Sequence, residues 1–409
     1  MRSIFGKNSM SAGAIRKTSV LICVHLWTIF FLFAFHAGAQ QTRAVWIRPF
    51  IGAGAEVRGD ERAARRFIAD ELGRVKRARL DTVFVETFWD GYTIYPSRYA
   101  PQRPLSIAHG TARPSAKNFD VLAIYLEEAA RLDIKVHAWL HVFHQWNTNL
   151  GDLKSSPIFA KNPEWAALDE NGSALVRSEA EGARREIFKV FLSPSNPRAR
   201  RYLENIVGEM AENYPQLAGA QWDYIRYPLH DAGQRFDFSA DALRRFKRAT
   251  GLDARRLRTD AERRRWQDWK TAQITATVER FDRIVRRLRP AWDVSVAVFP
   301  DFENTLKVKM QDSRAWARAG RIDSIYPMLY SPRFETVDDW AKEFRREIPR
   351  RTRVVPAFFI AHFYDARTKK IDDRYLETAT KYGYDGVAFF AAQLLTDDLI
   401  ERLGKDDKR

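Results

Sequence analysis

Residues Gly219–Pro228 read Gly-Ala-Gln-Trp-Asp-Tyr-Ile-Arg-Tyr-Pro, and the interpretation of the chain starts from this stretch. A short apolar approach leads into Asp223, and large rings with polar tips follow before Pro228 closes the run. This order is typical of a buried strand that ends in a functional loop. Asp223 is therefore the first candidate for chemistry. Its alternative roles are a helix cap or an ion-pair partner of Arg226.

Segments with strand character recur on both sides of this stretch and alternate with segments of helical apolar spacing. Eight strands in alternation with helices, without a flexible linker, predict an α/β fold, namely a (β/α)₈ TIM barrel. We expect one domain over residues 40–409, with insertions after the third strand (144–195) and the fourth (240–289). The turn-like Asp169–Gly172 in the first insertion suggests a small hairpin over one end of the fold. The expected strands are 43–50, 80–88, 134–143, one ending at Asp223, 293–299, 324–329, 353–359 and 386–390. The expected helices are 60–79, 121–132, 196–214, 240–289 with a break at Gly251, 312–319, 335–347 and 371–382.

Residues 1–39 differ in composition from the rest of the chain. They contain four basic residues and no acidic one, and the almost wholly apolar stretch Ser19–Phe35 precedes the small residues Ala37-Gly38-Ala39. This pattern predicts a cleaved secretory signal, with an uncleaved membrane anchor as the alternative. We therefore expect an exported protein, periplasmic or associated with the cell envelope, without stable membrane insertion after cleavage. The single cysteine, Cys23, lies in the same segment, so disulfides are not expected in the mature chain.

The chain carries a formal net charge of +16. A basic exported protein suits anionic surfaces such as cell-wall polymers. Much of the excess lies in Arg244–Arg265, where a solvated helix surface is the alternative interpretation. The sequence has no Gly-rich phosphate loop, no Gly-x-Ser-x-Gly elbow and no HExxH motif, which argues against several classes of enzyme.

In a TIM barrel the site lies at the carboxyl ends of the strands. The residues expected there are rich in rings and carboxylates, which suit a carbohydrate because ring faces stack on sugars and polar groups bind hydroxyls. The candidate substrate-binding residues are Trp46, Arg48, Trp89, His137, Trp139, His141, Tyr224, Arg226, Tyr227, Tyr326 and Tyr330.

Glycoside hydrolysis needs two carboxyl groups, one protonated as the acid and one ionised as the nucleophile or base. Asp223 is the expected ionised member. Glu86 is the first candidate for the acid, because desolvation between Val85 and Phe88 would raise its pKa, and Asp301 is the second. A substrate-assisted route would leave Asp223 with an orienting or acid role.

A metal site is the alternative interpretation of the histidines. His137 and His141 would share one face of a strand, but no third ligand is suitably spaced. We therefore expect no metal and no cofactor.

Several motifs resemble, in order, those of the bacterial glycosyl hydrolase-like barrel family. They are Arg43–Trp46, Tyr95–Ser97, Val136–Leu140, Asn162–Trp165, Ser193–Pro197, Asp223–Pro228, Phe299–Asp301 and Tyr326–Tyr330. The resemblance implies a TIM-barrel hydrolase of the cell envelope, in a family that includes a divisome-associated enzyme cutting peptidoglycan glycan strands without stem peptides.

This sequence departs from the family pattern at two places. Members often have two adjacent aspartates where this chain has Trp222-Asp223, so only Asp223 can take over that role. Relatives also tend to have Gln and Arg near the positions of Glu86 and Phe88, which weakens the support from the family for Glu86 as the acid.

The sequence thus predicts an exported glycoside hydrolase acting on an envelope polysaccharide, above all peptidoglycan glycan. The competing prediction is a non-catalytic carbohydrate-binding protein of the envelope on the same fold. A nucleic-acid-binding protein is a third prediction, which export and the lack of a recognisable nucleic-acid motif disfavour.

Overall fold

The computed structural model describes residues 41–53, 57, 60–104, 119–177, 188–228 and 235–405. The chain from Thr42 onward forms one compact unit. The predicted secretory segment 1–39 lies outside the described residues. None of the helices in the described ranges is long and apolar enough to span a lipid bilayer.

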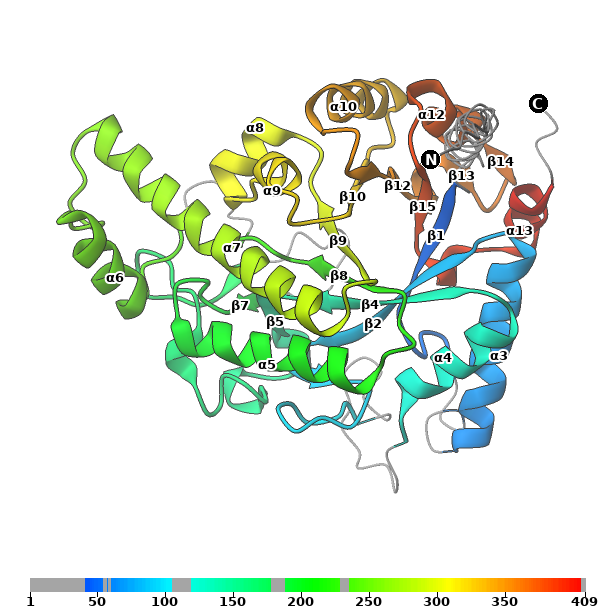
Figure 1. Cartoon of the computed structure of the whole chain (residues 1–409), viewed down its shortest axis with the longest axis horizontal. Coiled ribbons are helices and arrows are strands. Elements are labelled where there is room, and N and C mark those ends of the chain that lie inside the picture. Colours follow the sequence, from blue (N-terminus) through cyan, green and yellow to red (C-terminus); the bar gives the residue numbers. More distant parts are fainter. Residues whose placement is uncertain are drawn as a thin grey trace, which may run out of the picture. The chain divides into compact units, whose positions relative to one another are not determined.

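One large sheet organises this unit, and its strands follow the predicted order along the chain (Figure 1). The neighbours in space are β11-β10-β9-β8-β4-β2-β1-β15-β12, and all of these pairs are parallel. A short strand, β3, pairs antiparallel with β2. The strands are β1 (Thr42–Ile47), β2 (Thr82–Trp89), β3 (Tyr92–Thr93), β4 (Lys135–His141), β8 (Gly219–Asp223), β9 (Asp293–Val298), β10 (Ser324–Pro327), β11 (Arg353–Val354), β12 (Ala357–Phe359) and β15 (Gly386–Phe390).

The two ends of this sheet lie in one segment of chain. β11 pairs with β10 and β12 pairs with β15, and only Val355 and Pro356 separate β11 from β12. The sequence predicts one continuous strand over 353–359. The structure interrupts it at Pro356, which has no N–H to donate to a neighbouring strand.

The helices between these strands pack on the outside of the sheet (Figure 1). In α3, Asp60 caps the amino end, and Ala64, Ile68, Leu72 and Val75 form the buried stripe expected of an amphipathic helix. The helices are α3 (Glu61–Arg77), α4 (Val121–Arg131), α5 (Pro197–Asn213), α6 (Ala240–Thr250), α7 (Asp260–Leu288), α8 (Phe302–Asn304), α9 (Ser313–Arg318), α10 (Phe334–Glu347), α11 (Ile360–Phe363), α12 (Asp373–Tyr382) and α13 (Asp397–Gly404).

The core has two main layers because successive residues of a strand face opposite sides of the sheet. The larger layer lies between the sheet and the helices. The smaller one lies on the inner face, where the rings of Trp46 and Phe84 stack at 5.0 Å and Phe84 meets Tyr326 edge-on at 4.9 Å. Gly219 of β8 makes room for the neighbouring strand β9 and for His137. A Cβ on Gly219 would lie 2.2 Å from the carbonyl oxygen of Asp293 and 2.7 Å from His137 Nδ1.

Two segments extend beyond the alternating pattern. Residues 144–195, where the sequence suggests a hairpin, contain an antiparallel sheet of β5 (His144–Asn147), β7 (Phe188–Phe191) and β6 (Val176–Arg177). Residues 240–289 form α6 and α7, which project past the sheet in Figure 1 and enclose a small core of their own around Phe246 and Trp266. A third, minor pair of strands is β13 (Tyr364–Asp365) and β14 (Lys370–Ile371).

Candidate functional site

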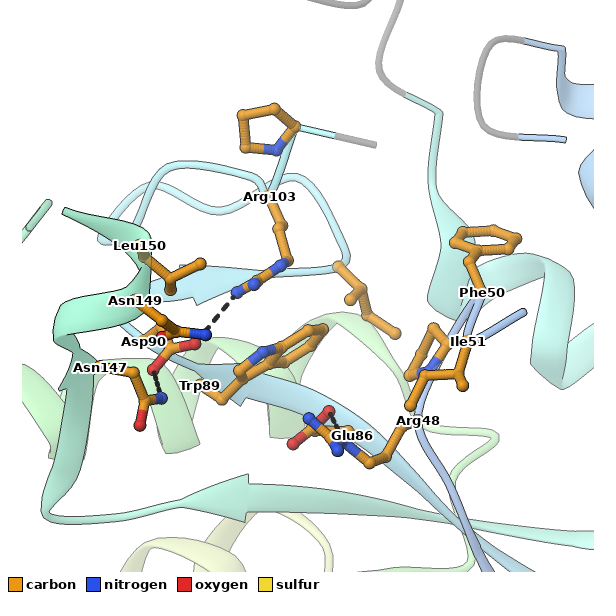
Figure 2. Close-up of a pocket in the computed structure, with 13 residues that line it drawn as sticks. Arg48, Phe50, Ile51, Glu86, Trp89, Asp90, Arg103, Asn147, Asn149 and Leu150 are labelled. Carbon is orange, nitrogen blue, oxygen red and sulfur yellow. Dashed lines mark hydrogen bonds and ion pairs between the residues drawn. The ribbon is translucent and has the colours of Figure 1, made fainter. Parts of the chain in front are cut away.

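A cavity of about 390 Å³ opens where β1, β2, β4 and β8 end. A smaller cavity of about 100 Å³ adjoins it and shares five lining residues with it (Figure 2). Ten of the predicted site residues line the larger cavity, and they are Trp46, Arg48, Glu86, Trp89, Trp139, His141, Asp223, Tyr224, Arg226 and Tyr330. The carboxyl ends of the strands therefore bring most of the candidates together.

Asp223 is the last residue of β8 and is partly exposed to the cavity. Its Oδ2 accepts a hydrogen bond from Trp139 Nε1 at 3.0 Å, and its Oδ1 accepts one from the backbone N–H of Tyr224 at 2.6 Å. Tyr224 has a φ of 49°, in the left-handed region that non-glycine residues rarely occupy. This backbone turn is a strained position of the kind that clusters at functional sites, and it directs the Tyr224 ring away from the strand.

The residue before Asp223 faces the other way. Trp222 is fully buried and packs against Phe281 of α7, with ring centroids 5.0 Å apart. The position where relatives often have a second aspartate therefore contributes to the helix layer in this chain and not to the cavity.

Glu86 lies on β2, next to a bulge at Thr87, and only 1% of its surface is exposed. Its Oε2 accepts a hydrogen bond from Arg48 Nε at 3.3 Å, and its Oε1 lies 3.1 Å from His141 Nε2 (Figure 2 draws the Arg48 contact). Burial alone would raise the pKa of Glu86, but Arg48 and His141 lower it below its ordinary value. The sequence predicts a raised pKa and an acid. The pKa is lowered and not raised because Arg48, which follows β1, and His141, at the end of β4, lie beside Glu86 only in the folded chain.

Asp90 anchors the loops beside the cavity. Its Oδ1 accepts a hydrogen bond from Asn147 Nδ2 at 2.8 Å, and its Oδ2 lies 3.5 Å from Arg103 Nη1 (Figure 2). The guanidinium of Arg103 in turn lies over the Trp89 ring, 4.4 Å from its centroid. This cation–π contact fixes the orientation of Trp89 at the mouth shared by the two cavities.

Aromatic rings form much of the remaining wall. Trp46 donates its Nε1–H to Gln221 Oε1 at 2.7 Å, and the rings of Tyr330 and Phe390 lie 6.0 Å apart. Burial, together with the negative charge of Asp223, raises the pKa of Tyr330 well above its ordinary value, so its hydroxyl stays protonated. The wall thus offers ring faces and a phenol donor beside Asp223.

The structure places His137 and Tyr326 at the opposite end of the sheet from the expected one. Both line a cavity of about 720 Å³ at the amino ends of the strands, with Lys135, Asp293 and Arg353. Neither is the last residue of its strand. His137 is the third residue of β4, and Tyr326 belongs to the inner ring layer itself, where its ring meets Phe84. Burial lowers the pKa of His137 to about 4.

Asp301 and Tyr227 also lie outside the candidate site. Asp301 is exposed and caps the short helix α8, where its carboxylate accepts a hydrogen bond from Asn304 N at 2.9 Å. Tyr227 is fully buried, and its hydroxyl lies 3.2 Å from Ser195 Oγ. These contacts give both residues a structural position.

Other cavity residues lie outside the set of candidates that the sequence supplied. They are Asp90, His144, Asn147, Lys189, Ala297, Phe299, Met328 and Phe390. Asp90, Phe299 and Phe390 end strands or follow them directly, and the strand-end rule points to Asp90 and Phe299. His144, Asn147 and Lys189 belong to the antiparallel sheet of residues 144–191, where the sequence suggests a hairpin but does not indicate which of its side chains reach the cavity.

The described residues contain no group of three or more His, Cys, Asp or Glu side chains placed to hold a metal ion. His141 and His144 do lie close together, with ring centroids 5.6 Å apart. The chemistry that these residues offer is acid–base and electrostatic, from Glu86, Asp223 and His141 in a ring-lined cavity.

Sequence comparisons relate the chain to proteins named as glycosyl hydrolases. It is 21% identical over 314 residues to glycosyl hydrolase DigH of Escherichia coli (strain K12), covering 72% of this chain and 65% of that protein. It is 22% identical over 354 residues to glycosyl hydrolase YngK of Bacillus subtilis (strain 168), covering 78% and 62%. The chain therefore spans less than two thirds of the length of these relatives.

Solved structures with a similar fold include glycosidases. A β-galactosidase from the psychrophilic Marinomonas ef1 has a TM-score of 0.58 at 12% sequence identity, covering 89% of this chain and 58% of that one. A β-galactosidase from Rahnella sp. R3 has a TM-score of 0.57 at 13% identity, covering 90% and 56%. These likenesses concern the fold, which is similar to glycosidase TIM barrels.

A family model, glycosyl hydrolase-like 10, matches residues 41–375, which contain every residue of the cavity described above except Phe390. The chain belongs to the glycosyl hydrolase-like 10 family.

Proposed function

We propose that this protein is an exported glycoside hydrolase that cleaves glycosidic bonds in an envelope polysaccharide, with peptidoglycan glycan as its substrate. One observation carries the proposal: Glu86 and Asp223 line the same ring-walled cavity from strands on either side of β4. Two carboxyl groups in a sugar-sized cavity are what glycoside hydrolysis requires. Membership of the glycosyl hydrolase-like family and the names of the relatives support the reaction class.

The proposal includes the complete (β/α)₈ barrel, with the segments after the third and fourth strands as insertions over its carboxyl-terminal end. The support is that β11 and β12 lie at the two ends of the sheet and belong to one strand segment. Closure would place Tyr330, after β10, opposite the ends of β2 and β4 across the cavity. This would surround a bound sugar with groups from several strands.

In the proposed mechanism Asp223 is the ionised carboxylate. The N–H groups of Trp139 and Tyr224 each bond a different oxygen of its carboxylate, which fixes the orientation of the carboxylate. Asp223 then acts on the anomeric carbon as the nucleophile, or as the base that takes a proton from water. In a substrate-assisted route it orients the substrate's own acetamido group instead.

We assign the acid role to Glu86 and His141 acting as a pair. The lowered pKa of Glu86 makes it a poor proton donor by itself. Its carboxylate lies 3.1 Å from His141 Nε2 and both side chains line the cavity, so a proton held by the pair is close to the bound glycan. This proton passes to the glycosidic oxygen as its bond to the anomeric carbon breaks, and water later returns a proton to the pair.

The test is mass spectrometry of soluble products after the full chain is incubated with peptidoglycan prepared with and without stem peptides. We expect sugar fragments from the wild-type protein and none from Asp223→Asn, and the fragment ends identify the bond that is cut. Activity of Asp223→Asn equal to wild type would contradict the assignment of Asp223. Glycan binding without fragments from either substrate would favour the alternative, a non-catalytic carbohydrate-binding protein.

A further inference from the structure

Four nitrogen-bearing side chains gather around the ring of Tyr224 on one side of the large cavity. The imidazoles of His141 and His144 each have their centroid 4.7 Å from the Tyr224 ring centroid. Arg226 Cζ lies 4.8 Å from that centroid, and Lys189 Nζ lies 5.6 Å from it. All of them line the cavity, so one wall of the site is rich in nitrogen. We call this set, His141, His144, Lys189 and Arg226, the nitrogen wall.

Arg226 and Lys189 of the nitrogen wall form no ion pair with a carboxylate of the described residues. Arg226 is 95% buried, its Nη1 donates to the Tyr227 carbonyl oxygen at 3.0 Å, and it forms no ion pair within the described part of the chain. Lys189 likewise has no ion pair among the residues that the structure describes. Arg48 and Arg103 of the neighbouring cavity are different, since they pair with Glu86 and Asp90.

A buried guanidinium without a carboxylate in direct contact is costly unless a ligand supplies that contact. Arg226 is surrounded by ring faces of Tyr224, Phe191 and Phe299, which stabilise a cation but provide no hydrogen-bond acceptor in the plane of its fork. Donor capacity therefore remains for a group that enters the cavity.

His144 gives an independent indication. It is 97% buried, lines the cavity, and neither of its ring nitrogens has a side-chain hydrogen-bond partner in the described ranges. Burial first, and then the neighbouring His141, Lys189 and Arg226, lower its pKa well below the ordinary value. His144 is thus neutral and can donate one hydrogen bond through whichever nitrogen carries the proton.

We propose that the nitrogen wall is a subsite for a carboxylate, so that the site takes a glycan whose sugar at this position is acidic. A carboxylate fits the planar fork of Arg226, and Lys189 adds a second charge at the mouth. Asp223 lies near enough to interact with the charge of Arg226, so one negative charge is favoured over two and a carboxylate over a phosphate dianion. The inference rests on the proposed function and specifies its substrate class.

The test compares two forms of one polymer. Glycan strands freed of stem peptides carry a carboxyl group on every second sugar, and carbodiimide activation followed by borohydride reduction converts these groups to alcohols. For each form we measure the dissociation constant by equilibrium binding to the full chain, and separately KM and kcat from the release of reducing ends. The expected result is about tenfold tighter binding of the native strands, with the difference lying in KM.

Lys189→Met tests the wall itself, and Lys161→Met is the matched control. Lys161 is an exposed lysine of the same inserted segment and does not line the cavity. We compare the affinity for native strands with the affinity for strands whose carboxyl groups are reduced to alcohols. Lys189→Met is expected to lower the ratio of these two affinities severalfold, whereas Lys161→Met keeps the wild-type ratio. If Lys189→Met weakens the binding of both strand forms alike, the ratio stays unchanged. That result is what a structural defect would give, and it overturns the proposal.

The outcomes separate the two proposals. Equal wild-type affinity for both strand forms, together with cleavage, overturns the carboxylate subsite and supports the hydrolase. A preference for native strands that Lys189→Met abolishes, without cleavage, supports the subsite and overturns the hydrolase. If neither form binds, both proposals are overturned.

Discussion

At the scale of single residues, Asp223 is the group on which catalysis should depend most. Replacing it by Asn keeps the shape and the hydrogen bond to Oδ1 but removes the negative charge. We expect kcat on glycan strands to fall by roughly 10²–10⁴-fold while the dissociation constant for the glycan changes little. Initial rates and equilibrium binding measure the two effects. Asp301→Asn is the control, because this exposed helix cap lies outside the cavity and should keep near wild-type kcat.

His137 gives a prediction about stability. Its pKa is about 4 in the folded chain and 6.5 ordinarily, so the unfolded chain binds more protons between these values. Above pH 6.5 His137 is neutral in both states and costs the folded chain nothing. As the pH falls towards 4, protonation of the unfolded chain lowers the free energy of unfolding by up to about 3 kcal/mol. Urea unfolding across this range should show a shallower pH dependence for His137→Gln than for wild type. An identical pH dependence in the two proteins would contradict a neutral, buried His137.

The same residues mark the limit of sequence interpretation at this scale. The period of two along a strand correctly indicates that 137, 139 and 141 share one face, but not how deep each lies. His137 meets Gly219 low in the sheet, whereas His141 is paired with Asp223 at the carboxyl end. The lowered pKa of Glu86 also depends on Arg48 and His141, which only the register brings together.

At the scale of elements, two glycines permit a comparison. Gly219→Ala would place a Cβ 2.2 Å from the Asp293 carbonyl oxygen, so β8 and β9 would have to separate. We expect a loss of at least about 2 kcal/mol in the free energy of unfolding. Gly208→Ala lies within α5 and meets only Ile284 Cγ2 at 4.0 Å. It should stabilise the protein by about 0.5–1 kcal/mol. Chemical denaturation of both variants checks the pair, and equal effects would contradict the described register.

The positions of helices and strands could be predicted well because periodicity and caps are local signals. Expected and observed bounds coincide for β15 and differ by one or two residues for α3 and α5, and Asp60 and Asn196 cap the helices that the sequence indicates. For residues 144–195 the sequence suggests a hairpin, but the three-stranded pairing could not be predicted, since the strands are short and β5 pairs with β7 across about forty residues. Because Lys189 and Asn147 belong to this three-stranded sheet, their place in the wall of the cavity could not be predicted either.

At the scale of the whole molecule, the excess of positive charge is partly concentrated on α6 and the first turns of α7. Lys247, Arg248, Arg264 and Arg265 are exposed and make no ion pair with another described residue. Reversing these four charges to Glu should weaken retention on isolated peptidoglycan sacculi at low salt, with less effect at 0.5 M salt. Hydrolysis of short soluble fragments should be unaffected.

The matched control reverses four exposed basic residues of α3, namely Arg62, Arg66, Lys76 and Arg77. This helix lies on the opposite side of the sheet from α6 in Figure 1. Co-sedimentation with sacculi at two salt concentrations distinguishes a local effect from one of net charge. Equal loss in the two variants would indicate that net charge alone determines retention.

The three tryptophans of the cavity wall, Trp46, Trp89 and Trp139, are a quarter of the twelve in the chain, and each has a polar or cationic neighbour. Indole emission responds to nearby charge and to the exclusion of water, so the site contains its own fluorophores. Titration of Asp223→Asn with a slowly cleaved oligosaccharide should change the intensity or wavelength of emission in a saturable manner. Occupancy of the cavity could then be followed in real time, without a label and without waiting for a product.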